Sequence, residues 1–202
     1  TLLTRMCLAV LSQHDCRIQI ITKSTLVTRD TDLLSRVPCT VALTITTEDD
    51  DTTKLIEPYA PPPTKRLKTV EALTSEGIPV SVRIDPIIPF VNDNPKSLIA
   101  ALASMGVKHV TSSTYKVKRD NWQRFAMSMP EAAEKLKPLY FEQGEKTGGY
   151  ALLPEALRLK LMSTIRRIAT ENGMKFGVCR ENLSHLNTAA CDGSWLLPNR
   201  PR

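Results

Sequence analysis

The sequence of 202 residues lacks three patterns that would each assign a class of protein. No apolar run approaches the ~20 residues that a membrane-spanning helix needs, so no membrane partner is expected. The opening residues lack the basic-then-apolar order of a secretory signal. The cysteines contain no CxxC pair, and their odd number in a chain too long to depend on disulfides favours a reducing, cytoplasmic setting. They are Cys7, Cys16, Cys39, Cys179 and Cys191.

The overall composition is that of an ordinary globular protein. Hydrophobic residues make up 42% and charged residues 24%, so disorder is not expected. The net charge of +6 would suit an anionic partner, although so small a surplus is also common in proteins that touch no nucleic acid. The first residue is Thr1 rather than methionine and adjoins an expected amphipathic helix, so we expect the gene product to contain residues upstream.

Strands and helices are expected to alternate four times in the first 115 residues. Apolar β-branched runs predict the strands, and amphipathic runs bounded by proline, asparagine or glycine predict the helices. The expected strands are 17–22, 40–47, 78–89 and 107–113, and the expected helices are 2–12, 30–37, 64–76 and 95–105, with an acidic loop at 48–51. Such alternation predicts an α/β fold of parallel βαβ units with right-handed crossovers.

The remainder of the chain is expected to be mainly helical. The expected helices are 121–129, 130–141 and 154–172, and a strand-like piece at 174–178 leads into the tail. The helix at 154–172 has the clearest apolar stripe, formed by Leu157, Leu161, Ile165 and Ile168. These residues therefore predict a helical C-terminal extension packed on the α/β part.

The strand at 78–89 carries charge on one of its two faces. Side chains alternate along a strand, so Ser81, Arg83 and Asp85 point away from the apolar side chains between them. A charged pair inside a fold is costly unless it is paired or holds a ligand. Pro86 and Pro89 end the strand, which places the charges at its C-terminal end, where chemistry is found in parallel α/β folds.

The other strands repeat this division into an apolar face and a polar face. The polar-face side chains are Gln19 and Lys23, Ala42, Thr44 and Thr46, Ser81, Arg83 and Asp85, and Thr111 and Ser113. A doubly wound sheet is normally apolar on both faces, whereas an open β/α barrel can be polar inside, so we expect a partial TIM-type (β/α) barrel with a small-molecule cavity. The alternative is that Arg83 and Asp85 pair with each other or with Lys23 and simply fill the barrel.

Several short stretches, taken together, resemble a known family. They are Thr22-Lys23-Ser24, Arg29-Asp30, Thr44-Ile45-Thr46-Thr47, Glu57-Pro58-Tyr59-Ala60-Pro61, Arg66-Leu67, Gly77-Ile78-Pro79 and Val82-Arg83-Ile84-Asp85-Pro86-Ile87-Ile88-Pro89. In order and spacing, from about residue 17 to 111, they are similar to the radical S-adenosylmethionine proteins related to spore photoproduct lyase, the DNA repair photolyase-like group.

This resemblance implies a fold, a chemistry and a set of site residues. Members use an incomplete barrel of six βα units, so residues 1–115 would be the third to sixth units and 116–202 the extension with its Cys/His-containing tail. A CxxxCxxC loop holds a four-iron four-sulfur cluster that cleaves S-adenosylmethionine into a radical, and the inherited substrate is a DNA lesion. Lys23 would hold the methionine carboxylate, Thr44 would replace a serine hydroxyl near the cofactor, and Ser24, Arg83 and Asp85 would line the same pocket.

The sequence departs from the family in one large respect, because it contains no CxxxCxxC. Three closely spaced thiolates are needed to leave one iron open, and Cys7 and Cys16 have the wrong spacing. These residues alone are therefore not expected to perform radical chemistry. An upstream segment or a partner would have to cover the sheet edge before Arg17. The rival interpretation is a non-catalytic barrel fragment or degenerate member that binds a small anion or a protein partner.

Two further groups of residues raise weaker hypotheses. Cys179, His185 and Cys191 could hold zinc or an auxiliary cluster, although eleven residues between the cysteines fit no common zinc pattern; the alternative is a reduced, partly buried pair. Basic residues around Trp122 and on the helix at 154–172 could contact DNA; the alternative is a solvated helix face and a packed tryptophan. These basic residues are Lys116, Lys118, Arg119, Arg124, Arg158, Lys160, Arg166 and Arg167.

Overall fold

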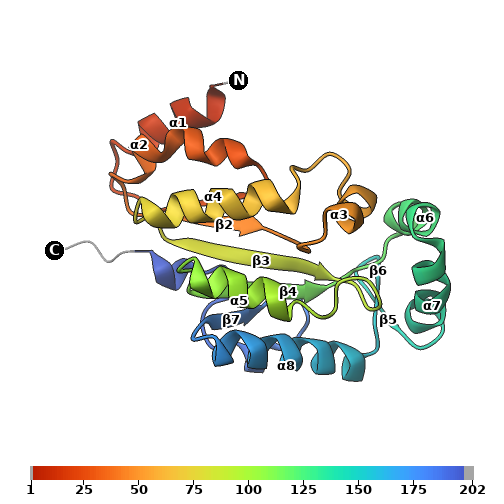
Figure 1. The fold of residues 1–202 in the computed structure, drawn as a ribbon. Helices are drawn as coiled ribbons and strands as arrows, with labels where there is room; N and C mark the ends of the chain where they lie inside the picture. Colours follow the sequence, from red (N-terminus) through yellow and green to blue (C-terminus); the bar gives the residue numbers. More distant parts are fainter. Residues whose placement is uncertain (1, 198–202) are drawn as a thin grey trace.

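The computed structural model describes residues 2–197 and contains a five-stranded parallel sheet in the order β1-β2-β3-β4-β7 (Figure 1). The strands are β1 (Ile18–Thr22), β2 (Cys39–Thr44), β3 (Val80–Ile87), β4 (His109–Thr114) and β7 (Lys175–Val178). The mixed α/β fold with parallel strands alternating with helices is therefore confirmed.

Helices connect the strands and cover one face of the sheet, where α4, α5 and α8 lie side by side (Figure 1). The helices are α1 (Leu3–Leu11), α2 (Thr31–Leu34), α3 (Asp50–Ile56), α4 (Pro63–Ser75), α5 (Lys96–Ser104), α6 (Arg119–Ser128), α7 (Pro130–Phe141) and α8 (Glu155–Glu171). The short 3-10 turns are η1 (Thr25–Asp30), η2 (Ser184–Leu186) and η3 (Ser194–Leu196). Pro63 begins α4, and Gly77 and Gly173 follow α4 and α8 in left-handed conformations, because a side chain there would be strained.

The alternation of side chains places the core on the helix-covered face. Buried Leu43, Val82 and Val110 pack there with Val70 of α4 and Ile165 of α8. The opposite face carries the polar side chains that the sequence predicts. A sheet covered by its crossover helices on one face only is the arrangement of a barrel wall and not of a doubly wound sheet.

Residues 116–197 are more than a helical extension, because one of their strands joins the main sheet. Helices α6 and α7 and the hairpin of β5 (Glu145–Thr147) and β6 (Tyr150–Leu152) lie beyond the end of β3 (Figure 1). Residues of α6, α7 and β6 form a second apolar cluster with Ile88. The chain then returns through α8, and β7 pairs in parallel with β4. The domain boundary at residue 115 stays a prediction. Strand β7 belongs to the same sheet as β1 to β4, and α8 is the helix that leads to it.

The tail crosses the polar face of the sheet. Gln19 of β1 donates to the carbonyl of Asp192, and the hydroxyl of Thr111 in β4 donates to the carbonyl of Cys191 at 2.7 Å. Trp195 donates its indole N–H to Nδ1 of His109 at 2.8 Å. The tail thus covers the polar face from β1 to β4.

Two local expectations differ from the structure. The acidic loop instead starts a helix, because the Asp49 side chain accepts the backbone N–H of Thr52 at 2.8 Å and caps α3. Helix α1 is present, but only Leu8 joins the core, and apolar side chains such as Met6 are exposed. No helix within residues 2–197 is both long and apolar enough to cross a membrane.

Candidate functional site

A polar row crosses the sheet near the C-terminal ends of its strands. Thr44 of β2 lies beside Arg83 of β3, which lies beside Thr111 of β4. Asp85 Oδ2 accepts from Arg83 Nη2 at 2.6 Å, and Asp85 Oδ1 accepts from the Ser113 hydroxyl at 2.5 Å. Arg83 and Asp85 therefore pair with each other, which was one of the alternatives for this strand. Their side chains keep 17% and 20% exposure, so neither is sealed in the core.

Lys23 does not join that pair, because it belongs to a second cluster around Glu57. Lys23 Nζ lies 2.7 Å from Glu57 Oε1, which also accepts from the Thr46 hydroxyl at 2.6 Å. Arg66 Nη2 lies 2.8 Å from Glu57 Oε2. We call Lys23, Thr46, Glu57 and Arg66 the Glu57 cluster. Two of its charged side chains lie in the interior: that of Glu57 is 7% exposed and that of Arg66 is fully buried. The Lys23 side chain is 46% exposed.

The Glu57 cluster is held by backbone contacts of Arg66. Arg66 Nε donates to the carbonyl of Pro61 at 2.7 Å, and Nη1 donates to that of Thr44 at 2.9 Å. Burial alone would raise the pKa of Glu57, but hydrogen bonds from Lys23 and Thr46 and the charges of Lys23 and Arg66 leave this pKa below its usual value. Glu57 is therefore a carboxylate that fixes the position of the Lys23 ammonium.

Sequence reasoning did not name Glu57 or Arg66 as site residues. Both lie in stretches that carry the family resemblance, Glu57-Pro58-Tyr59-Ala60-Pro61 and Arg66-Leu67. Their burial depends on the loop between α3 and α4 folding over the end of β2, which no local pattern encodes. Ser24, in contrast, has a local structural role, because its hydroxyl accepts the backbone N–H of Leu26 and caps η1.

A cavity of about 600 Å³ lies next to the Glu57 cluster, at the C-terminal ends of the strands. Its polar lining is Lys23, Thr46, Glu57, Asn121, Arg124 and Ser128, and its apolar and aromatic lining is Leu55, Ile56, Pro58, Tyr59, Pro86, Ile88, Tyr115, Phe125 and Met127. This volume and the mainly apolar lining with a few polar groups are typical of small-molecule sites. Tyr59 is fully exposed at the cavity.

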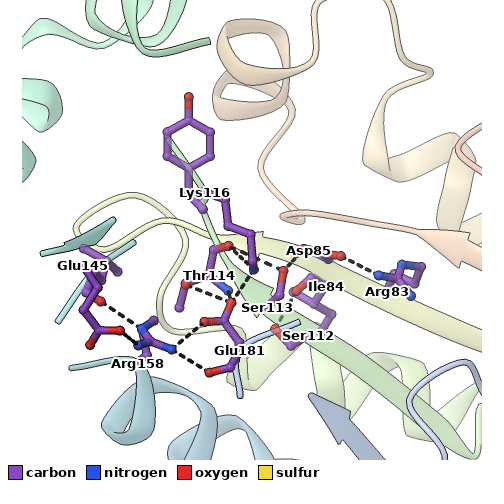
Figure 2. Close-up of polar contacts among 12 residues, drawn as sticks. Arg83, Ile84, Asp85, Ser112, Ser113, Thr114, Lys116, Glu145, Arg158 and Glu181 are labelled. Carbon is purple, nitrogen blue, oxygen red and sulfur yellow. Dashed lines mark hydrogen bonds and ion pairs between the residues drawn. The ribbon is translucent and has the colours of Figure 1, made fainter. Parts of the chain in front are cut away.

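A buried ionic network continues from the polar row toward α8 (Figure 2). Glu181 Oε1 accepts from the backbone N–H of Thr114 at 2.7 Å and from Lys116 Nζ at 2.5 Å. Arg158 donates to the Glu181 carbonyl at 2.6 Å and to Glu145 Oε2 at 2.7 Å. Arg158 and Glu181 are each 1% exposed, so this network fixes the end of β4 against α8 and the β5–β6 hairpin.

The three candidate metal ligands in the tail are only partly brought together. Cys191 packs against Gly177 on the polar face, two residues from Cys179 along β7. Among residues 2–197 no group of three His, Cys, Asp or Glu side chains is placed to hold a metal ion, and His185 is exposed. The geometry therefore gives the metal hypothesis no support. His109, which sequence reasoning did not name, lies on the polar face with Trp195 and Thr111.

The basic residues are mostly engaged with protein groups. Trp122 packs against Phe125, Tyr140 and Phe141 with ring centroids 5.1 to 6.0 Å apart. This ring is therefore packed against other aromatic side chains, which was the alternative to stacking on a DNA base. Arg158, named as a candidate DNA contact with a solvated helix face as the alternative, is instead buried in its ionic network. Other expected DNA contacts are likewise paired: Lys116 with Glu181, Arg124 with Asp120 and Arg167 with Glu171.

The fold is similar to the partial TIM-type barrel of radical S-adenosylmethionine enzymes. One solved structure with a similar fold is a spore photoproduct lyase mutant with bound AdoMet and dinucleoside spore photoproduct, which matches with a TM-score of 0.66 at 14% identity, over 87% of this chain and 54% of that chain. The lyase complexed with dinucleoside spore photoproduct also matches with a TM-score of 0.66 at 14% identity, over 88% and 55%. At this identity the match establishes the fold alone.

Comparison of sequences adds relatives but no assigned activity. No family model matches the chain. The uncharacterized protein ORF301 of Acidianus two-tailed virus is 36% identical over 97 residues, which are 44% of this chain and 32% of that protein. The uncharacterized protein Rv2578c of Mycobacterium tuberculosis is 29% identical over 101 residues, 46% of this chain and 30% of that protein. The chain thus spans about a third of the length of these relatives.

Proposed function

We propose that this chain forms the cofactor-binding wall of a radical S-adenosylmethionine enzyme of the DNA repair photolyase-like group. The observation that carries the proposal is the polar row beside Lys23, at the C-terminal ends of a parallel sheet whose fold is similar to spore photoproduct lyase. Parallel barrels bind their ligands at this end of the sheet. The five free cysteines favour a reducing, cytoplasmic setting for this activity.

The residues that line the cavity fit S-adenosylmethionine. The Lys23 ammonium is half exposed beside the cavity, and an ammonium has three donors, so it can keep Glu57 and also bind the methionine carboxylate. Asp85 lies outside this lining, in the polar row, where it is paired with Arg83. The apolar lining suits the adenosyl end of the cofactor. When bound, this cofactor supplies the adenosyl group from which a radical is generated.

The residues do not fit the four-iron four-sulfur cluster. Neither the CxxxCxxC spacing in the sequence nor a group of three ligands within residues 2–197 is present. We derive no chemical step through the cluster from this chain. In our proposal its ligands come from a segment outside these residues, and the same segment pairs with the open edge of β1, where Ile21 is 60% exposed.

The proposed substrate is a lesion in DNA, bound at the open side of the cavity. Support comes from the dinucleoside spore photoproduct in the neighbouring structures and from the exposed side chains of Tyr59 and Arg124 at the cavity. An aromatic ring and a nearby guanidinium can stack a base and contact a phosphate. Tyr59 takes the stacking role that the packed ring of Trp122 does not fill.

The rival function is a non-catalytic barrel fragment that binds a small anion or a protein partner. An iron and sulfide assay with an absorbance spectrum, on anaerobically prepared whole gene product, separates the two. The proposal predicts about four irons and four sulfides per chain and the broad visible absorbance of such a cluster. A well-folded whole gene product without iron or sulfide after reconstitution would contradict the enzyme proposal, and phosphate binding by that protein would favour the rival.

A further inference from the structure

Cys179 and Cys191 come to the same face of the sheet although eleven residues separate them in the sequence. The Cys179 N–H donates to the Ser112 carbonyl at 2.9 Å, so Cys179 continues the β4–β7 ladder. Residues two apart share a face of a strand, which puts Cys179 on the same face as Gly177. A Cβ built on Gly177 would lie 2.5 Å from Cys191 Cα and 3.0 Å from its Cβ. The missing side chain at Gly177 is therefore what lets Cys191 reach this face.

The two side chains lie near each other. Burial and the neighbouring Cys179 thiol raise the pKa of Cys191, whereas the nearby charge of Arg83 acts in the opposite direction. The hydroxyl of Thr111 holds the carbonyl of Cys191 at 2.7 Å. Both cysteines are partly exposed, so a small oxidant can reach them. Cys191 packs against Gly177, and Cys179 lies two residues farther along the same strand face, so the backbone brings the two cysteines to neighbouring positions.

The remaining cysteines are placed differently. Cys39 is buried and its thiol donates to the carbonyl of Leu34 at 3.1 Å. The Cys16 thiol donates to the carbonyl of Leu11 at 3.3 Å, and Cys7 is exposed on α1. These three provide internal controls for general thiol oxidation.

We propose that Cys179 and Cys191 form a reversible disulfide that ties the tail to β7 beside Arg83. The oxidant is a small-molecule disulfide. One protein thiolate attacks it, forming a mixed disulfide and releasing one small thiol; the second protein thiol then attacks the mixed disulfide, forming the internal bond and releasing the second small thiol. Two protein thiols and one small disulfide thus become one protein disulfide and two small thiols. The bond links the two ends of residues 180–190, which include η2.

The test is oxidation by glutathione disulfide, followed by alkylation of free thiols and peptide mapping by mass spectrometry without reduction. We expect a linked Cys179–Cys191 peptide pair, reversed by dithiothreitol, to form before any link to Cys7, Cys16 or Cys39. Complete alkylation of both Cys179 and Cys191 under conditions that give Cys7 a mixed disulfide would overturn the proposal.

Two variants test the geometry. Cys191→Ser preserves the tail backbone and should leave Cys179 trapped as a mixed disulfide, whereas the matched control Cys16→Ser should cross-link like the wild type. Gly177→Ala should lose the cross-link, because the added Cβ displaces Cys191. A folded Gly177→Ala protein that cross-links at the wild-type rate, or a Cys191→Ser protein whose Cys179 does not react, would contradict the placement of the pair.

Discussion

The hydrogen bonds of His109 predict a specific dependence of stability on pH. Trp195 donates to Nδ1 of His109 at 2.8 Å, so the ring proton lies on Nε2 and faces the Thr111 hydroxyl at 3.1 Å, which in turn donates to the Cys191 carbonyl. A proton on Nδ1 would point at the indole N–H of Trp195 and break this hydrogen bond, because both groups would then be donors. Burial, aided by the charge of Arg83 and opposed by that of Asp192, lowers the pKa of His109 to about 4.

The size of the effect follows from the two pKa values. Between pH 4 and 6.5 the unfolded chain binds a proton that folded His109 does not, so the free energy of unfolding falls as the pH falls. The slope is about 1.4 kcal/mol per pH unit, which amounts to about 3 kcal/mol over this window, and above pH 6.5 the contribution no longer changes.

Urea unfolding of the wild type and His109→Gln between pH 4 and 7 measures this slope. The difference in free energy of unfolding between the two proteins should change by about 3 kcal/mol across the window. His185→Gln is the matched control, because His185 is exposed, and its curve should follow the wild type. Equal pH slopes for the wild type and His109→Gln would contradict a neutral, buried His109 in the folded protein.

Two other predictions concern the Glu57 cluster and the sheet edge. Arg66→Ala should lower the free energy of unfolding by about 3 kcal/mol or more, because Glu57 loses its buried partner, whereas Arg124→Ala at the exposed pair with Asp120 should change it by roughly 0.5 kcal/mol or less. Equal effects in urea unfolding would contradict the buried role of Arg66. Hydrogen exchange at the outer amides of β1 should be fast in this chain and protected in the whole gene product; equally fast exchange in both would contradict the proposed covering segment.

The polar face was predictable because it depends only on alternation within each strand. Ser81, Arg83 and Asp85 occupy every second position, and the parallel register then places Arg83 beside Thr44 without further information. The one-sided helix cover follows from the apolar positions between them. Period-two patterns therefore determined which strand residues form the polar face.

The partners of the charges were not predictable in this way. Pairing of Lys23 with Glu57 rather than with Asp85 depends on where the loop before α4 settles on the strand ends. Arg158 did carry a signal that was not used: it lies four residues before Met162 and seven before Ile165, on the buried face of α8. A charge on an apolar stripe indicates a buried ion pair.

The contacts of the tail could not be predicted from the sequence, because they join residues far apart in the chain. Trp195 reaches His109 across 86 positions, and Cys191 reaches the face of Gly177 only because that residue has no side chain. No periodic pattern spans such distances. Only the path of the tail across the folded sheet determines which polar residues of the sheet the tail covers.

We propose that Lys23 binds the carboxylate of S-adenosylmethionine, and calorimetric titration of this cofactor into the anaerobic whole gene product is the direct test. Lys23→Ala should weaken binding by roughly tenfold or more, the loss expected for a charge-assisted hydrogen bond. The matched variant Lys160→Ala, at an exposed position of α8, should bind like the wild type. Equal affinities for all three proteins, or no binding by the folded wild type, would contradict the account.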